Sequence, residues 1–134
     1  MSWETFFLVG VGGFFGANLR YLLTLFITES LANATGITLP FGTGFVNLTG
    51  SMLLAMFTFW VSQRTGFLSD SLKLLVGTGF FGAYTTFSTY ANESVNLFYM
   101  GSWGSSFAYV LLTNALCLLG VIVGLWLANL LWSV

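Results

Sequence analysis

The sequence predicts an all-α membrane protein with four transmembrane helices, the third of them broken near its middle. Of its 134 residues, 57% are hydrophobic and only 5% are charged, whereas soluble domains carry about 25% charged residues. A spanning helix needs roughly 20 apolar residues, so four spans with short loops use up the length. We therefore expect one four-helix transmembrane domain over residues 1–134, embedded in the lipid bilayer of the cell membrane.

The composition excludes several function classes. The net charge is −1 and the chain has no basic run, which argues against a nucleic-acid partner. It has no His and a single Cys, Cys117, so an intrachain disulfide is impossible and a His/Cys metal site is unsupported. Because no Ser/His/Asp set or pair of carboxylates falls within a span, we expect no enzyme activity.

The first span is expected over residues 5–28. Its Gly12-to-Gly16 spacing is a small-xxx-small pattern, which lets another helix backbone approach closely. Arg20 is costly inside a span unless it snorkels or finds a partner, and the simpler interpretation is an anchor near the membrane edge. A polar loop is expected over residues 29–39.

The second span is expected over residues 41–61. Pro40 precedes it, and proline suits a first helical turn because its missing N–H is not needed there. A loop is expected over residues 63–71.

The third span, over residues 72–98, contains the stretch Gly77–Glu93, which reads GTGFFGAYTTFSTYANE. Glycine and hydroxyl residues at membrane depth permit a helix to break, because the freed backbone groups are satisfied again inside protein. Such a break exposes carbonyls and amides at the bilayer midplane, as in transporters that build ion sites this way. We expect the break near Gly82–Thr86.

The fourth span is expected over residues 105–131. Tyr109, Thr113 and Cys117 recur at i, i+4 and i+8, which places them on one helix face. Gly120 and Gly124 repeat the close-packing pattern.

The positive charges favour neither orientation strongly. With four spans, both termini and the second loop share one side, which carries Arg64 and Lys73, and the other side has at most Arg20. Positive residues in cytoplasmic loops normally fix orientation. A bias of two against one is feeble, so the chain is expected to insert either way, and two copies to pair antiparallel.

Uncharged hydrogen-bond donors dominate the polar positions of the spans: Asn47, Ser88, Thr89, Tyr109 and Thr113. Donors without a fixed positive charge suit a small anion that must bind and then leave. The alternative for each hydroxyl taken singly is a bond within its own helix or between helices.

Phe87 and Tyr90 lie at i and i+3, on one helix face. Aromatic ring edges carry positive partial charge, so this pair is able to present ring edges to an anion, although for the pair taken alone ordinary packing is the favoured explanation. Glu93 is the only carboxylate within a predicted span, and we expect it toward the far end of that span. A proton-coupled small multidrug transporter would need a carboxylate in the first span, which has only Arg20.

Three segments resemble the small bacterial fluoride channels of the Fluc (CrcB) family: Gly12–Tyr21 (GGFFGANLRY), Gly42–Ser51 (GTGFVNLTGS) and Gly79–Tyr90 (GFFGAYTTFSTY). They occur in the family's order, and the length and four-span layout also match. The resemblance implies a passive channel that lets accumulated fluoride leave the cell, built as an antiparallel homodimer of dual topology with two pathways along the subunit interface.

The resemblance also implies a role for individual residues. Asn47 would donate to fluoride, and Phe87 and Tyr90 would occupy the family's two aromatic-box positions. Ser88 and Thr89 would lie near the pathway, and Tyr109 and Thr113 would continue it along the fourth span. A structural sodium ion, which is not transported, would be held by the backbone carbonyls of Gly82 and Thr85.

One residue departs from the family pattern, because the second aromatic-box position is usually Phe and here is Tyr90. Its hydroxyl is able to donate to fluoride, donate elsewhere or crowd the pore. Two other functions remain as alternatives to the channel: a fluoride/proton antiporter, and a non-transporting membrane assembly subunit in which the third span only holds helices together.

Overall fold

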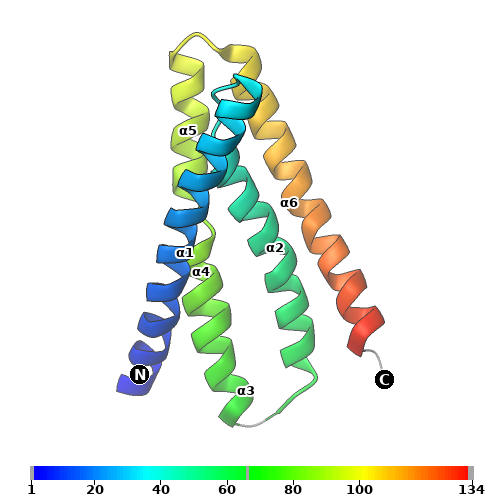
Figure 1. Ribbon diagram of the computed structural model, residues 1–134. Helices are drawn as coiled ribbons and strands as arrows, with labels where there is room; N and C mark the ends of the chain where they lie inside the picture. The colour runs from blue at the N-terminus through cyan, green and yellow to red at the C-terminus, as the bar shows by residue number, and fades with distance from the viewer. Residues whose placement is uncertain (1, 66, 133–134) are drawn as a thin grey trace.

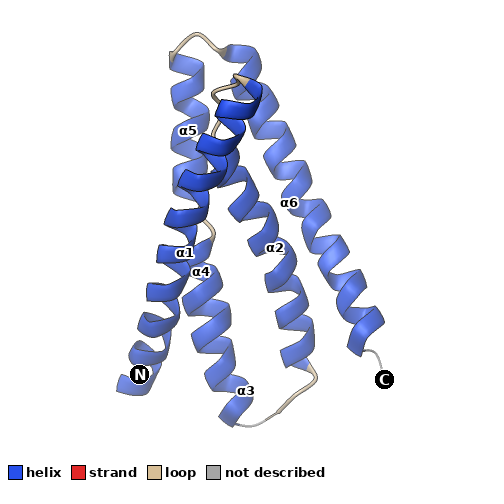
Figure 2. Cartoon of the chain, in the orientation of Figure 1, coloured by secondary structure: helices blue, strands red, loops and turns tan. Residues whose placement is uncertain are grey.

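The computed structural model describes residues 2–65 and 67–132, and helices joined by short connections account for this part of the chain (Figure 2). In order they are α1 (Trp3–Thr35), α2 (Phe41–Ser62), α3 (Phe67–Leu72), the π-helix η1 (Lys73–Phe81), α4 (Gly82–Tyr84), α5 (Phe87–Tyr99) and α6 (Trp103–Trp132). The segments from α3 to α5 follow one another as a single interrupted rod. The prediction of four helices with a broken third one is therefore confirmed.

The four rods alternate in direction, so the start of α1 and the end of α6 lie at the same end of the bundle as the end of α2 and the start of α3 (Figure 1). Within the described residues, three helices are long and apolar enough to cross a membrane, namely α1, α2 and α6. The third rod reaches a comparable length only by adding its pieces together, which is what a broken span requires.

Two predicted loops are shorter than expected. The prediction of a loop over residues 29–39 is wrong for residues 29–35, because α1 continues to Thr35. Gly36 ends the helix with φ 71°, a left-handed conformation that glycine adopts without strain, and its N–H donates to the Ala32 carbonyl at 2.8 Å. The prediction of a loop over residues 63–71 is wrong for residues 67–71, because α3 begins at Phe67.

Glycines bring helix backbones into direct contact, as their spacing predicted. A Cβ added at Gly12 or Gly16 of α1 would overlap a backbone carbonyl oxygen of η1. A Cβ at Gly124 of α6 would overlap the Met52 carbonyl oxygen of α2 in the same way. The α1–η1 and α2–α6 pairs are accordingly the most extensive contacts between helices.

The apolar interior of a single chain is small. Val46, Phe81 and Tyr84 form its buried cluster, and the Tyr84 ring stacks on Phe80 with 5.7 Å between centroids. Large apolar side chains instead cover much of the outside, as a chain in lipid allows.

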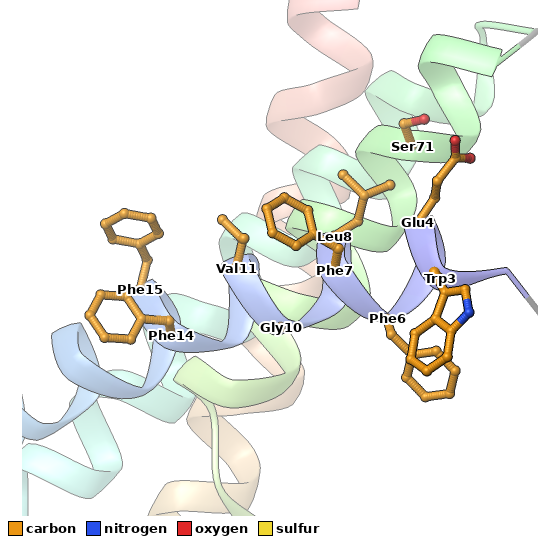
Figure 3. Close-up of a pocket in the computed structure, with 10 residues that line it drawn as sticks. All are labelled: Trp3, Glu4, Phe6, Phe7, Leu8, Gly10, Val11, Phe14, Phe15 and Ser71. Carbon is orange, nitrogen blue, oxygen red and sulfur yellow. The ribbon is translucent and has the colours of Figure 1, made fainter.

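An open groove of about 1110 Å³ runs along the N-terminal half of α1. Figure 3 shows its aromatic side chains arrayed along that helix, with Glu4 and Ser71 together at one end. Every other lining residue is apolar, so this groove suits lipid or a protein neighbour and offers an ion almost no ligands.

Candidate ion site at the helix break

The break in the third rod falls on two threonines. Thr85 has φ −89° and ψ 159°, and Thr86 has φ −152° and ψ 116°, so both are extended. Gly82 itself stays helical at φ −62° and ψ −31°. The predicted location near Gly82–Thr86 is confirmed, but β-branched residues, which prefer extended backbone, carry the break, and the glycine does not.

Asn47 of α2 holds this break in place through both ends of its side-chain amide. The Thr86 N–H donates to Asn47 Oδ1 at 2.8 Å, and Asn47 Nδ2 donates to the Thr86 carbonyl at 3.0 Å. Asn47 is buried, with 9% of its surface exposed. An amide nitrogen carries two hydrogens, so one N–H of Asn47 remains for a further acceptor.

The Thr86 side chain then starts α5. Its Oγ1 accepts from the Thr89 N–H at 3.2 Å, which makes Thr86 the N-cap of that helix. The same oxygen donates to Thr89 Oγ1 at 3.0 Å.

These bonds divert the donors that Gly82 and Thr85 would have in an unbroken helix. The carbonyl of residue i normally accepts from the N–H of residue i+4. In a regular helix the Thr86 N–H would donate to the Gly82 carbonyl, but here it donates to Asn47 Oδ1. The Thr89 N–H would likewise donate to the Thr85 carbonyl, but here it donates to Thr86 Oγ1. Two neighbouring carbonyls at the break thus lose their regular helical donors, and carbonyl oxygens are ligands that suit a hard cation.

A polar pocket of about 220 Å³ opens beside the break. It is lined by Asn47, Ser51, Thr85, Thr86, Phe87, Tyr90, Thr113, Asn114 and Cys117. The Phe87 and Tyr90 rings flank it with 5.7 Å between centroids and planes tilted by 58°. The structure therefore gathers four of the seven predicted pathway residues, Asn47, Phe87, Tyr90 and Thr113, around one space, together with Thr85, one of the two predicted sodium ligands.

The other three predicted pathway residues, Ser88, Thr89 and Tyr109, do not line this pocket, and neither does Gly82. Ser88 is exposed at the start of α5, with its Oγ 3.4 Å from Thr86 Oγ1. Thr89 lines a second pocket, of about 270 Å³, together with Thr86 and Arg20. Sequence reasoning missed that Arg20 borders the same space as these threonines, and contacts across helices leave no spacing signal in the sequence.

Tyr109 contacts a carboxylate that was not predicted to belong to the pathway. Its hydroxyl donates to Glu93 Oε2 at 2.9 Å, and Thr43 Oγ1 donates to Glu93 Oε1 at 2.8 Å. Glu93 is half-buried between α2 and α6 and also lines a pocket of about 390 Å³ beside Pro40 and Met100. One of the two predicted pathway residues of the fourth span therefore contacts a carboxylate, which the expectation of purely neutral donors did not include.

Helices of membrane-spanning length with a polar pocket at a helix break define a multi-pass membrane protein that keeps hydrogen-bonding groups within its spans. Residues 7–125 match the model of the family described as CrcB-like protein, Camphor Resistance (CrcB), and the chain belongs to this family. A relative from Koribacter versatilis (strain Ellin345), named "Fluoride-specific ion channel FluC", is 41% identical over 122 residues, covering 91% of this chain and 93% of the relative.

Two Shewanella relatives carry the same name. The protein of Shewanella frigidimarina (strain NCIMB 400) is 41% identical over 117 residues, covering 87% of this chain and 90% of the relative. The protein of Shewanella sediminis (strain HAW-EB3) is 39% identical over 116 residues, covering 87% of this chain and 89% of the relative. In every case the alignment covers most of both chains, so the similarity extends over the whole bundle and is not confined to one motif.

Proposed function

We propose that the chain is a fluoride-selective passive channel of the cell membrane, through which accumulated fluoride leaves the cell. The observation that carries the proposal is the pocket at the break, which Asn47 and Thr113 line together with the aromatic residues Phe87 and Tyr90. The names of the relatives agree with this function.

The donors around the pocket replace the water that a fluoride ion loses on entering the membrane. The remaining N–H of Asn47 and the Thr113 hydroxyl are neutral, so they bind an anion without trapping it as a fixed cation would. The electropositive edges of Phe87 and Tyr90 add attraction without a proton that can be transferred. Arg20, in the neighbouring pocket with Thr86 and Thr89, raises the local concentration of anions at the approach to this site.

The complete pathway needs a second copy of the chain, arranged antiparallel to the first. In one chain Phe87 is 78% exposed, although it flanks the pocket. Ser88 and Gly82, which adjoin the break, are exposed as well. Polar and ion-binding groups facing bare lipid are unfavourable, and a partner of opposite orientation would cover them, since the bias of positive residues is too weak to select one orientation.

A structural sodium ion fits the two carbonyls that have lost their helical donors. In the antiparallel pair, Gly82 and Thr85 of both copies would hold it, and its charge would satisfy acceptors that otherwise cost about 1–3 kcal/mol each. Replacing sodium by a large organic cation should lower both the thermal stability of the dimer and fluoride flux, and sodium should restore both. Full stability and flux in sodium-free buffer would eliminate the site.

One observation favours a second candidate, the fluoride/proton antiporter. Glu93 is a carboxylate in contact with the predicted pathway residue Tyr109, and intramembrane carboxylates are the usual proton carriers of transporters. Both of its oxygens already accept hydrogen bonds from uncharged hydroxyls, an arrangement that holds the carboxylate in place. The channel remains the better-supported function, and Glu93→Gln separates the two, because a channel keeps fluoride flux that an obligatory proton exchanger loses.

The direct test is anion efflux from liposomes that contain the purified protein, with internal fluoride or internal chloride and the same pH on both sides. The proposal predicts rapid fluoride efflux and chloride efflux at the level of protein-free liposomes. Equal efflux of both ions would contradict selectivity. Efflux of neither would favour the assembly-subunit alternative.

A further inference from the structure

Tyr90 stands where fluoride channels of this family usually have Phe, and its surroundings decide what its hydroxyl does. Only 7% of the residue's surface is exposed. The ring lies between Phe87 and Tyr109, with centroids 5.7 Å and 5.5 Å away. The hydroxyl at the far end of the ring reaches helix α6.

Asn114 of α6 meets that hydroxyl. Its Nδ2 donates one hydrogen to the Tyr90 hydroxyl oxygen and the other to the Val110 carbonyl, at 2.8 Å in the second case. The Tyr90 hydroxyl donates to the same Val110 carbonyl at 3.4 Å. Asn114 and Tyr90 therefore share one acceptor, and the three groups form a closed hydrogen-bonded triangle between α5 and α6.

This triangle uses the one hydrogen that the Tyr90 hydroxyl is able to give. A tyrosine hydroxyl has a single O–H donor, and here that donor faces the Val110 carbonyl. The short bond from Asn114 holds this hydroxyl at α6, with its hydrogen toward Val110 and away from fluoride in the adjoining pocket. A free hydroxyl would add a strong donor to a site that must also release its ion. Keeping the Tyr90 hydroxyl away from fluoride therefore favours release of the ion and so conduction.

We infer that Asn114 is a positioning residue that anchors the Tyr90 hydroxyl to α6, so that Tyr90 presents its ring to the pathway as a phenylalanine would. The inference rests on the proposed channel function. It assigns Asn114 no contact with the ion, and its action runs entirely through Tyr90. Its signature is dependence on the hydroxyl: removing Asn114 matters when residue 90 is tyrosine and ceases to matter when it is phenylalanine.

The test measures fluoride efflux for four proteins: the natural chain, Asn114→Leu, Tyr90→Phe, and the double variant. Asn114→Leu should lower flux about fivefold in the natural chain, the factor that corresponds to one net hydrogen bond. In the Tyr90→Phe background the same change should lower flux by less than about twofold. Asn129→Leu, at an exposed position of the same helix, is the matched control and should leave flux unchanged.

Asn114→Ser supplies a second variant in case the leucine variant assembles poorly. Serine still bonds to the carbonyl four residues earlier, which is Val110, but its side chain is too short to reach Tyr90. The melting temperature in detergent, measured for the same combinations, should show the same dependence on Tyr90. This readout stays valid if the chain carries no fluoride, so a failure of the channel function is distinguishable from a failure of the anchor.

Three results would overturn the inference. Equal losses from Asn114→Leu in both backgrounds would mean that Asn114 acts without Tyr90. No loss in the natural background would mean that the anchor is irrelevant. Complete loss of flux in assembled Tyr90→Phe would mean that the hydroxyl itself is a donor to fluoride.

Discussion

Replacing Asn47 should free the backbone at the helix break from α2, and it should also remove a donor to fluoride. Asn47→Ala deletes both bonds to Thr86, at 2.8 and 3.0 Å. Two net hydrogen bonds contribute about 1–3 kcal/mol. This corresponds to a shift of about 5- to 150-fold in the equilibrium between the Thr86 backbone bound to α2 and the same backbone released from it. Because Thr86 also caps α5, the disturbance reaches the first turn of that helix and the adjoining pocket.

Asn47→Asp separates the two roles of the side chain. A carboxylate still accepts from the Thr86 N–H, so part of the bridge survives, but it has no N–H to offer the Thr86 carbonyl or an anion. We expect flux to fall to background in both variants. The melting temperature in detergent and the dimeric size should be measured alongside liposome efflux. Asn129→Ala, at an exposed position of α6, is the control and should change none of the three.

The outcome that refutes this reasoning is an Asn47→Ala protein with the melting temperature and the fluoride flux of the natural chain. It would mean that neither the bridge to Thr86 nor the free N–H matters. Natural flux in a correctly assembled Asn47→Asp protein would remove Asn47 from the pathway and leave it only the structural role.

Three further predictions concern the ring pair, the glycine packing and the topology. Phe87→Ile should cut fluoride flux because it removes an electropositive ring edge and keeps an apolar side chain, whereas Phe107→Ile, at an exposed position of α6, should not; equal flux in both would make Phe87 a packing residue. Gly12→Ala should destabilise the protein by about 1–3 kcal/mol, since the new methyl group overlaps a backbone carbonyl oxygen of η1. Gly10→Ala, whose methyl group meets nothing within 4 Å, should be tolerated. Equal thermal unfolding of the two variants would contradict this prediction. A cysteine added at the N-terminus of a Cys117→Ala chain should be labelled from both sides of the membrane, and one-sided labelling would rule out an antiparallel pair of identical chains.

Much of the fold follows from local sequence signals. Four long apolar segments leave few architectures in a bilayer, and the glycine spacings at Gly12–Gly16 and Gly120–Gly124 correctly indicated where helices meet. The approximate position of the break was also predictable, because Thr85 and Thr86 sit in a segment too polar for a continuous lipid-facing helix. Helix ends were less accurate: α1 runs to Thr35 because nothing before Gly36 stops it.

The π-helix η1 was not predicted, since its wider turn has no compositional signature and its glycines also fit an ordinary helix. The bridge from Asn47 to Thr86 was not predicted either, because it joins residues far apart in the sequence. The contacts of Glu93 with Thr43 and Tyr109 were missed for the same reason. Sequence reasoning selected residues of the right chemistry, and only the packing of α2, α5 and α6 shows which of them meet.

In the proposed channel, fluoride moves passively through a pathway that is not coupled to protons. The measurement that tests it most directly is the reversal potential of the reconstituted protein, first under a fluoride gradient at equal pH and then under a pH gradient at equal fluoride. A passive fluoride channel should give the Nernst potential of fluoride in the first case and zero in the second. A reversal potential that follows the proton gradient would contradict the channel and assign proton exchange, with Glu93 as its first candidate carrier.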